Sequence, residues 1–234
     1  MSPIAERTIL ITGAAGGLGR TVVGFFLEKG FRVIATVLNE TEKQALGTNP
    51  LLDTQIVDLS EEEEAASLVQ ESLRTYKTID AALLLVGGFA MGGVTDTRGA
   101  DLRKMIALNL ETAFYVARPL YAQMLAQGKG RLIFIGARPA LVPAQGKNAV
   151  AYALSKSLLF HLADILNADA KGKDVVAHVV VPSTIDTPAN RKSMPDADPG
   201  NWVTPAQLAE IFYFICSSSS TVLREPVWKV YNKA

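Results

Sequence analysis

The chain has a single cysteine, Cys216, among 234 residues, so it cannot form an internal disulfide, which is typical of a reducing compartment. An excess of one charge is also absent, because 23 lysines and arginines balance 23 aspartates and glutamates. No stretch approaches the roughly 20 apolar residues of a membrane span, and the first residues lack the basic start and apolar run of a signal peptide. We therefore expect a cytoplasmic protein with no nucleic-acid partner and no membrane partner.

What the chain does contain is apolar sequence, 49% of its residues, which is ample for a large core. Short apolar runs predict strands at residues 7–12, 31–37, 54–59, 79–86, 130–135, 175–181 and 226–231. Helical spacing predicts helices at 18–29, about 60–76, 101–127, 149–169 and 204–216, with Ser60 and Glu63 as a capping box. Near-continuous apolar strands separated by helices are typical of a parallel sheet covered on both faces. Residues 1–234 are thus predicted to form one doubly wound α/β domain of the Rossmann type, with about seven parallel strands.

A glycine-rich segment, TGAAGGLG, runs from Thr12 to Gly19 between the first predicted strand and helix. Gly13, Gly17 and Gly19 would allow a tight turn and let backbone N–H groups approach a pyrophosphate, whose charge suits a helix N-terminus. The alternative is a merely flexible turn. Its place between strand and helix favours dinucleotide binding.

A second pattern, YALSK, puts Tyr152 and Lys156 four residues apart at the start of a predicted helix. A cation one helical turn away favours the anion of a phenol, whose free pKa is about 10. Asn109 is an amide in the middle of a predicted helix, where propensity does not favour it. The alternatives are an ordinary half-buried tyrosine and a solvent-facing asparagine.

The glycine pattern, Asn109 and the Tyr152–Lys156 pair together resemble the short-chain dehydrogenase/reductase family over essentially the whole chain. The resemblance implies that Tyr152 donates a proton, that Lys156 binds the nicotinamide ribose and lowers the pKa of Tyr152, and that Asn109 holds a water that relays protons. Asp58 would contact adenine, the alternative being an aspartate turn or helix cap. No metal site is predicted. The cofactor-binding residues that the resemblance implies are Gly13, Gly17, Leu18, Gly19, Val37, Asp58, Leu59, Gly87, Tyr152, Lys156, Pro182 and Ile185.

One expected side chain is missing. Where the family keeps a serine to polarise a carbonyl, this chain has Ala137, followed by Arg138. The segments 79–89, 136–141 and 185–195 resemble the dihydropteridine reductases, a subgroup that also lacks this serine. A quinonoid ring spreads the incoming electrons over several atoms, so that one tyrosine acid suffices.

The resemblance therefore implies an NAD(P)H-dependent reductase of a small cyclic substrate, with a quinonoid dihydropterin favoured. Phe89 would be placed to stack on its ring, the alternative being an ordinary loop aromatic packed on the core. Two alternatives stay open: a carbonyl or alcohol oxidoreductase with an atypical donor, and a nucleotide-binding regulator without turnover. Val37 stands where NAD-dependent members carry an acid, which slightly favours NADP over NAD. Residues 186–200 show neither helix nor strand periodicity and are predicted to form a lid over the substrate, the alternative being a disordered surface loop. The apolar faces of the helices at 101–127 and 149–169 imply a homodimer or homotetramer.

Overall fold

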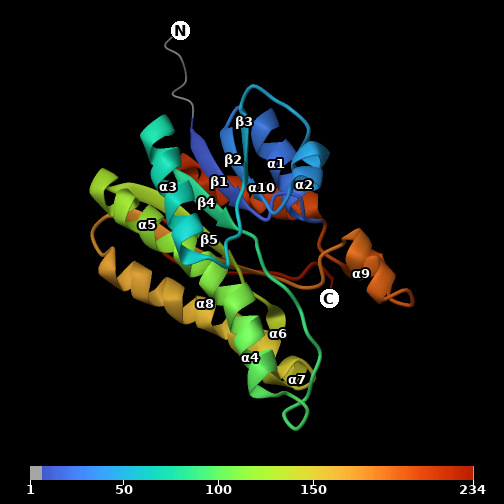
Figure 1. The fold of residues 1–234 in the computed structure, drawn as a ribbon. Coiled ribbons are helices and arrows are strands. Elements are labelled where there is room, and N and C mark those ends of the chain that lie inside the picture. The colour runs from blue at the N-terminus through green and yellow to red at the C-terminus, as the bar shows by residue number, and fades with distance from the viewer. Residues whose placement is uncertain (1–6, 234) are drawn as a thin grey trace.

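A computed structural model describes residues 7–233 and shows one seven-stranded sheet (Figure 1). The strand order is β3-β2-β1-β4-β5-β6-β7, and every neighbouring pair is parallel. The carboxyl ends of the strands therefore meet at one edge, and the predicted parallel sheet is confirmed. The strands are β1 (Thr8–Thr12), β2 (Arg32–Val37), β3 (Leu52–Ile56), β4 (Ala81–Leu84), β5 (Lys129–Ile135), β6 (Asp174–Pro182) and β7 (Val227–Val230).

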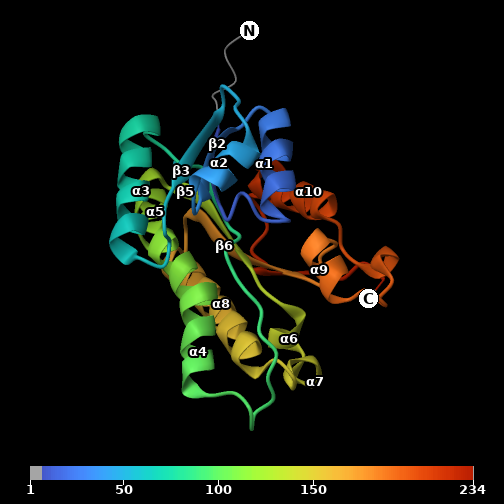
Figure 2. The same cartoon turned by 45° about the vertical axis from the view of Figure 1, so that its right-hand side comes forward.

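Helices cover both faces of the sheet, as expected (Figure 2). One face packs against α1 (Gly19–Glu28) and α10 (Pro205–Cys216), and the other against α3 (Glu62–Tyr76), α5 (Thr112–Gln127) and α8 (Val150–Asp169). Successive side chains of β1 point to opposite faces of the sheet and join two separate hydrophobic cores. Leu10 joins the cluster that contains Leu120 of α5, whereas Ile11 joins the cluster that contains Phe212 of α10. The strands are apolar on both sides because both sides are buried.

Two predictions between the third strand and the helix that follows it are wrong. The third strand ends at Ile56 rather than at residue 59, so Leu59 lies in the turn that follows. The capping box of Ser60 and Glu63 does not form, because α3 begins at Glu62 and its N-cap, Glu61, makes no side-chain cap bond. Ser60 instead donates its hydroxyl and its backbone N–H to Asp58.

The long helix predicted at 101–127 is interrupted. It consists of α4 (Gly99–Ile106), a π-helical turn over Ala107–Glu111, and α5. Such an insertion rotates the helix locally and often marks a functional site. Asn109 lies at its centre.

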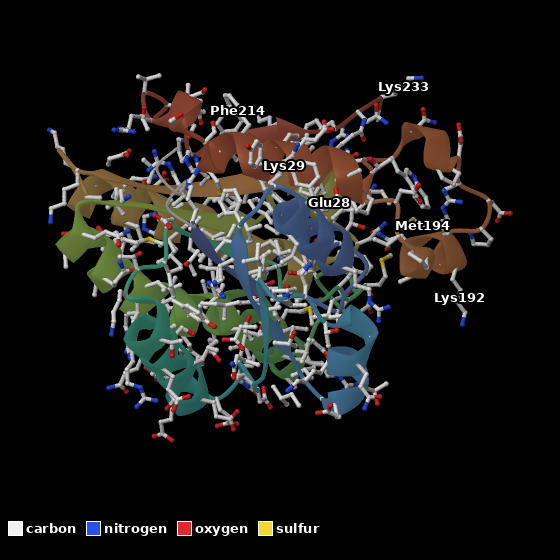
Figure 3. All side chains as sticks on the ribbon, turned by 90° about the horizontal axis from the view of Figure 1, so that it is seen from above. Glu28, Lys29, Lys192, Met194, Phe214 and Lys233 are labelled. Atoms are coloured by element: carbon white, nitrogen blue, oxygen red, sulfur yellow. The ribbon has the colours of Figure 1, made fainter. Side chains whose placement is uncertain are left out.

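Several short helices were not predicted from the sequence. They are α2 (Glu40–Leu46), α6 (Arg138–Leu141), α7 (Pro143–Gly146) and α9 (Pro188–Ser193), with 3₁₀ turns at Pro199–Asn201 and Ser218–Ser220. Residues 186–200, which we call the lid segment, therefore contain a helix that the sequence did not predict. Thr187 caps this helix, α9, by accepting a bond from the N–H of Asn190. Figure 3 shows Lys192 and Met194 on the part of this segment that stands out from the sheet.

Within residues 7–233 no helix is long and apolar enough to cross a membrane. The same residues contain no group of three His, Cys, Asp or Glu side chains able to hold a metal ion. The sequence-based interpretation of the N-terminus rests partly on residues 1–6, which lie outside the described part of the chain.

Candidate active site

The glycine loop joins the end of β1 to α1, at the carboxyl edge of the sheet. Gly13 has a φ of +63°, which glycine adopts without strain. Gly19 packs directly on the loop, because a Cβ there would overlap the carbonyl oxygen of Gly13. The hydroxyl of Thr12 accepts the N–H of Leu85 at 3.0 Å, which ties this loop to the end of β4.

Gly17 is exposed and faces the lid segment. A Cβ at Gly17 would stand 3.0 Å from Cβ and Cγ2 of Thr187. Leu18 is the N-cap of α1, and the guanidinium of Arg20 donates to the carbonyl of Ala15 at 2.8 Å. The loop thus combines a helix N-terminus with side-chain-free backbone, the features by which proteins hold a pyrophosphate.

The second strand ends where the adenosine ribose of a dinucleotide would lie. Val37 is only 3% exposed and belongs to the core, so its side chain does not reach the surface, whereas Leu38 is 63% exposed. A carboxylate nevertheless lies beside the end of β2, because the N–H of Leu38 donates to the side chain of Glu42 at 2.9 Å. Glu42 was not singled out from the sequence, since it lies in α2, which the patterns missed.

Asp58 lies two residues beyond β3 and is exposed. Its Oδ1 accepts the hydroxyl of Ser60 at 2.7 Å and the N–H of Ser60 at 2.9 Å. The side-chain bond from Ser60, and then the backbone bond, hold the pKa of Asp58 below its ordinary value. Asp58 therefore forms the aspartate turn foreseen as its alternative, and its contact with adenine stays a prediction. Leu59 beside it is buried.

Asn109 is fully buried, so the solvent-facing alternative is wrong. Its Oδ1 accepts the N–H of Gly88 at 2.9 Å, and its Nδ2 donates to the carbonyl of Gly88 at 3.2 Å and to the hydroxyl of Ser155 at 3.0 Å. The amide thereby links the loop after β4 to helix α8. That Asn109 also holds a proton-relaying water stays a prediction.

Gly87 lies against both polar residues of this cluster. A Cβ at Gly87 would be 2.7 Å from Oδ1 of Asn109 and 3.0 Å from Nζ of Lys156. No other residue type fits here without moving them. Lys156 is 5% exposed and donates to the carbonyl of Ile135, the last residue of β5, at 2.8 Å.

Tyr152 lies in the first turn of α8, one helical turn before Lys156. The positive end of the helix favours a phenolate there. Burial has the opposite effect, raising the pKa of Tyr152 to about 12, while burial lowers the pKa of Lys156 to about 8. In the protein without cofactor, burial therefore sets the direction of the Tyr152 pKa shift, and its lowering by Lys156 stays a prediction.

Three further contacts position this tyrosine. Ser155 donates its hydroxyl to the carbonyl of Tyr152 at 2.9 Å. Phe89, 60% exposed, meets the Tyr152 ring edge to face with centroids 4.9 Å apart. The loop that carries Phe89 is fixed to the start of α8, because the N–H of Gly92 donates to the carbonyl of Asn148 at 2.8 Å. Ser155 was missed from the sequence, although it stands beside Lys156 in the YALSK pattern.

Ala137, which the sequence predicts to stand in place of the serine, is the N-cap of α6 and is 4% exposed. The loop that follows folds into α6 and α7 and packs on α8, since a Cβ at Gly146 would be 3.0 Å from Cβ of Ala153. Pro182 ends β6 as a buried residue, and Ile185 pairs with Val203 in an isolated parallel bridge at the base of the lid segment.

The site residues therefore divide into two groups. The structure brings together Gly87, Asn109, Tyr152 and Lys156, with Phe89 and Ser155. Gly13, Gly17, Leu18, Gly19, Val37, Asp58, Leu59, Pro182 and Ile185 lie at or just beyond the carboxyl ends of β1, β2, β3 and β6.

Comparison of the sequence with known proteins identifies its family. Residues 7–198 match the model of the short chain dehydrogenases. The chain is 30% identical over 220 residues to a dihydropteridine reductase of Dictyostelium discoideum, covering 92% of this chain and 90% of that protein. It is 25% identical over 189 residues to dehydrogenase/reductase SDR family member 6 of Rattus norvegicus, covering 81% and 75%.

Solved structures agree on the fold. ElxO with NADP bound has a TM-score of 0.88 at 18% identity, covering 96% of this chain and 97% of that chain. A structure described as an NAD(P)-dependent gluconate 5-dehydrogenase of Beutenbergia cavernae, with bound NADP, has a TM-score of 0.86 at 24% identity, covering 98% and 96%. The chain belongs to the short-chain dehydrogenase/reductase family and is an NAD(P)-dependent oxidoreductase.

Proposed function

We propose that this oxidoreductase reduces a small cyclic substrate of the quinonoid dihydropterin type, with Tyr152 as proton donor. The observation that carries the proposal is a site with a partly buried tyrosine and a buried lysine and asparagine, but only the methyl group of Ala137 where the sequence predicts the carbonyl-polarising hydroxyl to be missing. The 30% identity to a dihydropteridine reductase over 92% of the chain supports it.

The glycine loop fits a dinucleotide, since Gly13 has a positive φ and Gly17 leaves exposed, side-chain-free backbone at the N-terminus of α1. When bound, the nicotinamide supplies the hydride. Lys156 would hold the nicotinamide ribose, and Thr187 would close on the cofactor from the lid segment. We favour NADP over NAD because position 37 holds a valine in place of an acid. The carboxylate of Glu42 next to Leu38 opposes this choice, since it would repel a 2′-phosphate.

Burial keeps Tyr152 protonated at neutral pH, since its pKa is raised to about 12. A protonated phenol is the form that donates. Reduction of the ring consumes one hydride and one proton, and this proton leaves the hydroxyl of Tyr152. The resulting phenolate is stabilised by the N-terminus of α8 and by the Lys156 ammonium one turn away. Lys156, with a pKa lowered to about 8, is poised to give up a proton and regenerate the phenol.

The missing hydroxyl is explained by the substrate. Hydride addition to a ketone concentrates charge on one oxygen, which then needs a strong hydrogen-bond donor. A quinonoid ring spreads this charge over ring nitrogens and an amide, so the methyl of Ala137 costs little. Phe89 supports a flat substrate, because its exposed ring lies beside Tyr152 where it could stack on a bound heterocycle.

A second candidate is a carbonyl or alcohol oxidoreductase with another donor. It is favoured by the variety among the relatives, which include an acetoacetyl-CoA reductase of Acinetobacter at 28% identity over 198 residues, covering 78% of this chain and 76% of that protein. A regulator without turnover is disfavoured, because mere nucleotide binding does not require a positioned proton donor.

We also propose that the chain forms a homodimer or homotetramer in the cytoplasm through α5 and α8. Leu154, Leu158 and Ile165 on α8 and Phe114 on α5 are exposed by 50%, 38%, 54% and 37%. Light scattering after gel filtration tests this, and a monomer at micromolar concentration would contradict it.

The deciding experiment measures NADPH and NADH oxidation by the protein with freshly generated quinonoid dihydropterin. We expect turnover, and a loss of roughly 10²- to 10⁴-fold in Tyr152→Phe, the range for a positioned acid. Tyr213→Phe, a change in α10 on the other face of the sheet, is the control and should retain the parent's rate. No turnover by the parent, or equal rates for parent and Tyr152→Phe, would refute the pterin proposal.

A further inference from the structure

Arg138 is a cation for which the described residues supply no hydrogen-bonding partner. It directly follows Ala137, and its side chain is partly buried. Its buried Nε has no hydrogen-bond partner, and within residues 7–233 its guanidinium makes no ion pair. The guanidinium instead stacks on the ring of Tyr231, whose centroid lies 4.6 Å from Cζ of Arg138. By contrast, the buried Arg131 reaches the carboxylate of Asp174 at 2.7 Å.

The aromatic partner of Arg138 is held firmly. Tyr231 directly follows β7, and its carbonyl accepts the hydroxyl of Ser183, just after β6, at 3.0 Å. The next residue, Asn232, donates its amide to the carbonyl of Trp202 at 2.7 Å. The ring is therefore anchored between the end of β6 and the far end of the lid segment, so the stacked guanidinium is preorganised rather than free.

Arg138 is also close in the chain to the candidate active site, because Ile135, three residues earlier, accepts the hydrogen bond of Lys156. It begins α6 at the carboxyl edge of β5, and the α6–α7 loop packs against the helix that carries Tyr152. Figure 2 shows α6, α9 and the C-terminal end gathered at this edge of the sheet. A guanidinium stacked on a ring still presents its N–H fork along its edge, which suits a planar group with two neighbouring acceptor atoms.

We propose that Arg138 is a substrate-binding residue, held flat by Tyr231, which donates two hydrogen bonds to adjacent acceptor atoms of the substrate. This rests on the proposed function only in using the same site. In a pterin the acceptors are the lactam oxygen and the neighbouring ring nitrogen, an edge with the geometry of the guanine O6/N7 edge that arginine binds in DNA. In a carboxylic acid they are the two carboxylate oxygens.

Binding to the protein–NADPH complex, measured by isothermal titration, tests this without relying on turnover. Matched probes separate the two acceptor types: pterin against 2-aminopteridine, which lacks the lactam oxygen, and benzoate against benzamide. For whichever acceptor-bearing probe binds, we expect Arg138→Met to weaken binding roughly 10- to 100-fold, the range for a bidentate arginine contact. The partner probe lacking the acceptor pair should bind the parent and Arg138→Met alike.

Three variants complete the test. Arg118→Met removes an exposed arginine on α5 that pairs with Glu62, and should bind like the parent. Tyr231→Phe keeps the ring and should also bind like the parent, whereas Tyr231→Leu should weaken binding several-fold. Arg138-dependent binding of benzoate alone would support the arginine site and refute the pterin proposal. Equal binding by the parent, Arg138→Met and Arg118→Met, or no binding of either acceptor probe to the parent, would overturn the assignment.

Discussion

The side-chain nitrogen of Asn109 donates to the hydroxyl of Ser155 at 3.0 Å, and Ser155 in turn donates to the carbonyl of Tyr152 at 2.9 Å. These bonds connect the π-helical turn to the first turn of α8. Together with the two bonds between Asn109 and Gly88, they connect Asn109 to the helix turn that carries Tyr152, so we expect Asn109 to help position the proton donor.

Asn109→Ala should therefore damage both stability and catalysis. It removes the acceptor of the Gly88 N–H and one of the two partners of the Ser155 hydroxyl, which keeps its bond to the carbonyl of Tyr152. A polar group left unsatisfied costs about 1–3 kcal/mol. Ser155→Ala, which removes one hydroxyl and leaves the bonds to Gly88, should cost less. Urea unfolding and kcat measure the two effects. Equal stability of Asn109→Ala and the parent would show that this network does not hold the site.

Gly17→Val should abolish cofactor binding while the fold persists. The new Cβ would press on Thr187, 3.0 Å away, and its methyl groups would enter the path of the pyrophosphate. Gly24→Ala is the matched control, since nothing lies within 4 Å of a Cβ there and alanine favours the helix. Titration with NADPH and NADH, with circular dichroism for the fold, checks this. Unchanged affinity in Gly17→Val would move the cofactor away from this loop.

Cofactor preference should respond to Glu42. Glu42→Gln removes the carboxylate beside Leu38 and should shift the ratio of NADPH to NADH affinity toward NADPH, because a phosphate would no longer meet a like charge. Leu38→Arg, at a side chain 63% exposed, should act in the same direction. Glu40→Gln on the same helix is the control. Val37→Asp is a poor test because it would bury a carboxylate in the core. Unaltered ratios in both variants would show that the ribose lies elsewhere.

The contribution of Lys156 to the stability of the cofactor-free protein should rise with pH between about 8 and 10.5. Lys156 has a folded-state pKa of about 8 against an ordinary value of 10.5. Between these pH values the unfolded chain binds more protons than the folded chain, so the Lys156 contribution to the free energy of unfolding increases with pH. Below pH 8 the protein carries a buried ammonium at full cost, a penalty of about 3 kcal/mol for a shift of this size. Lys156→Met should lack this dependence, so its stability advantage over the parent should shrink from pH 7.5 to 10. A constant difference in urea unfolding would contradict the burial of a charged lysine.

The sequence predicted the fold because its signals are local. Apolar runs as long as one strand identify β1, β2 and β4 to β6, and the glycine loop and the YALSK pattern each lie within one short segment. The π-helical turn at Asn109, the approach of Glu42 to Leu38 and the stacking of Arg138 on Tyr231 were not predicted. The first is a backbone irregularity that no side-chain period encodes, the second depends on a short helix capped by Asn39, and the third joins residues that only the order of the sheet brings together.

The missing hydroxyl allows a direct test of the account. The measurement is kcat/KM for quinonoid dihydropterin and for a simple ketone, with the parent and with Ala137→Ser. We predict that the parent strongly prefers the pterin, because no localised oxyanion forms on that ring. Ala137→Ser should raise kcat/KM for the ketone and leave that for the pterin nearly unchanged, since a new donor helps only where charge concentrates. A parent that prefers the ketone, or a serine variant that accelerates the pterin as much as the ketone, would contradict the account.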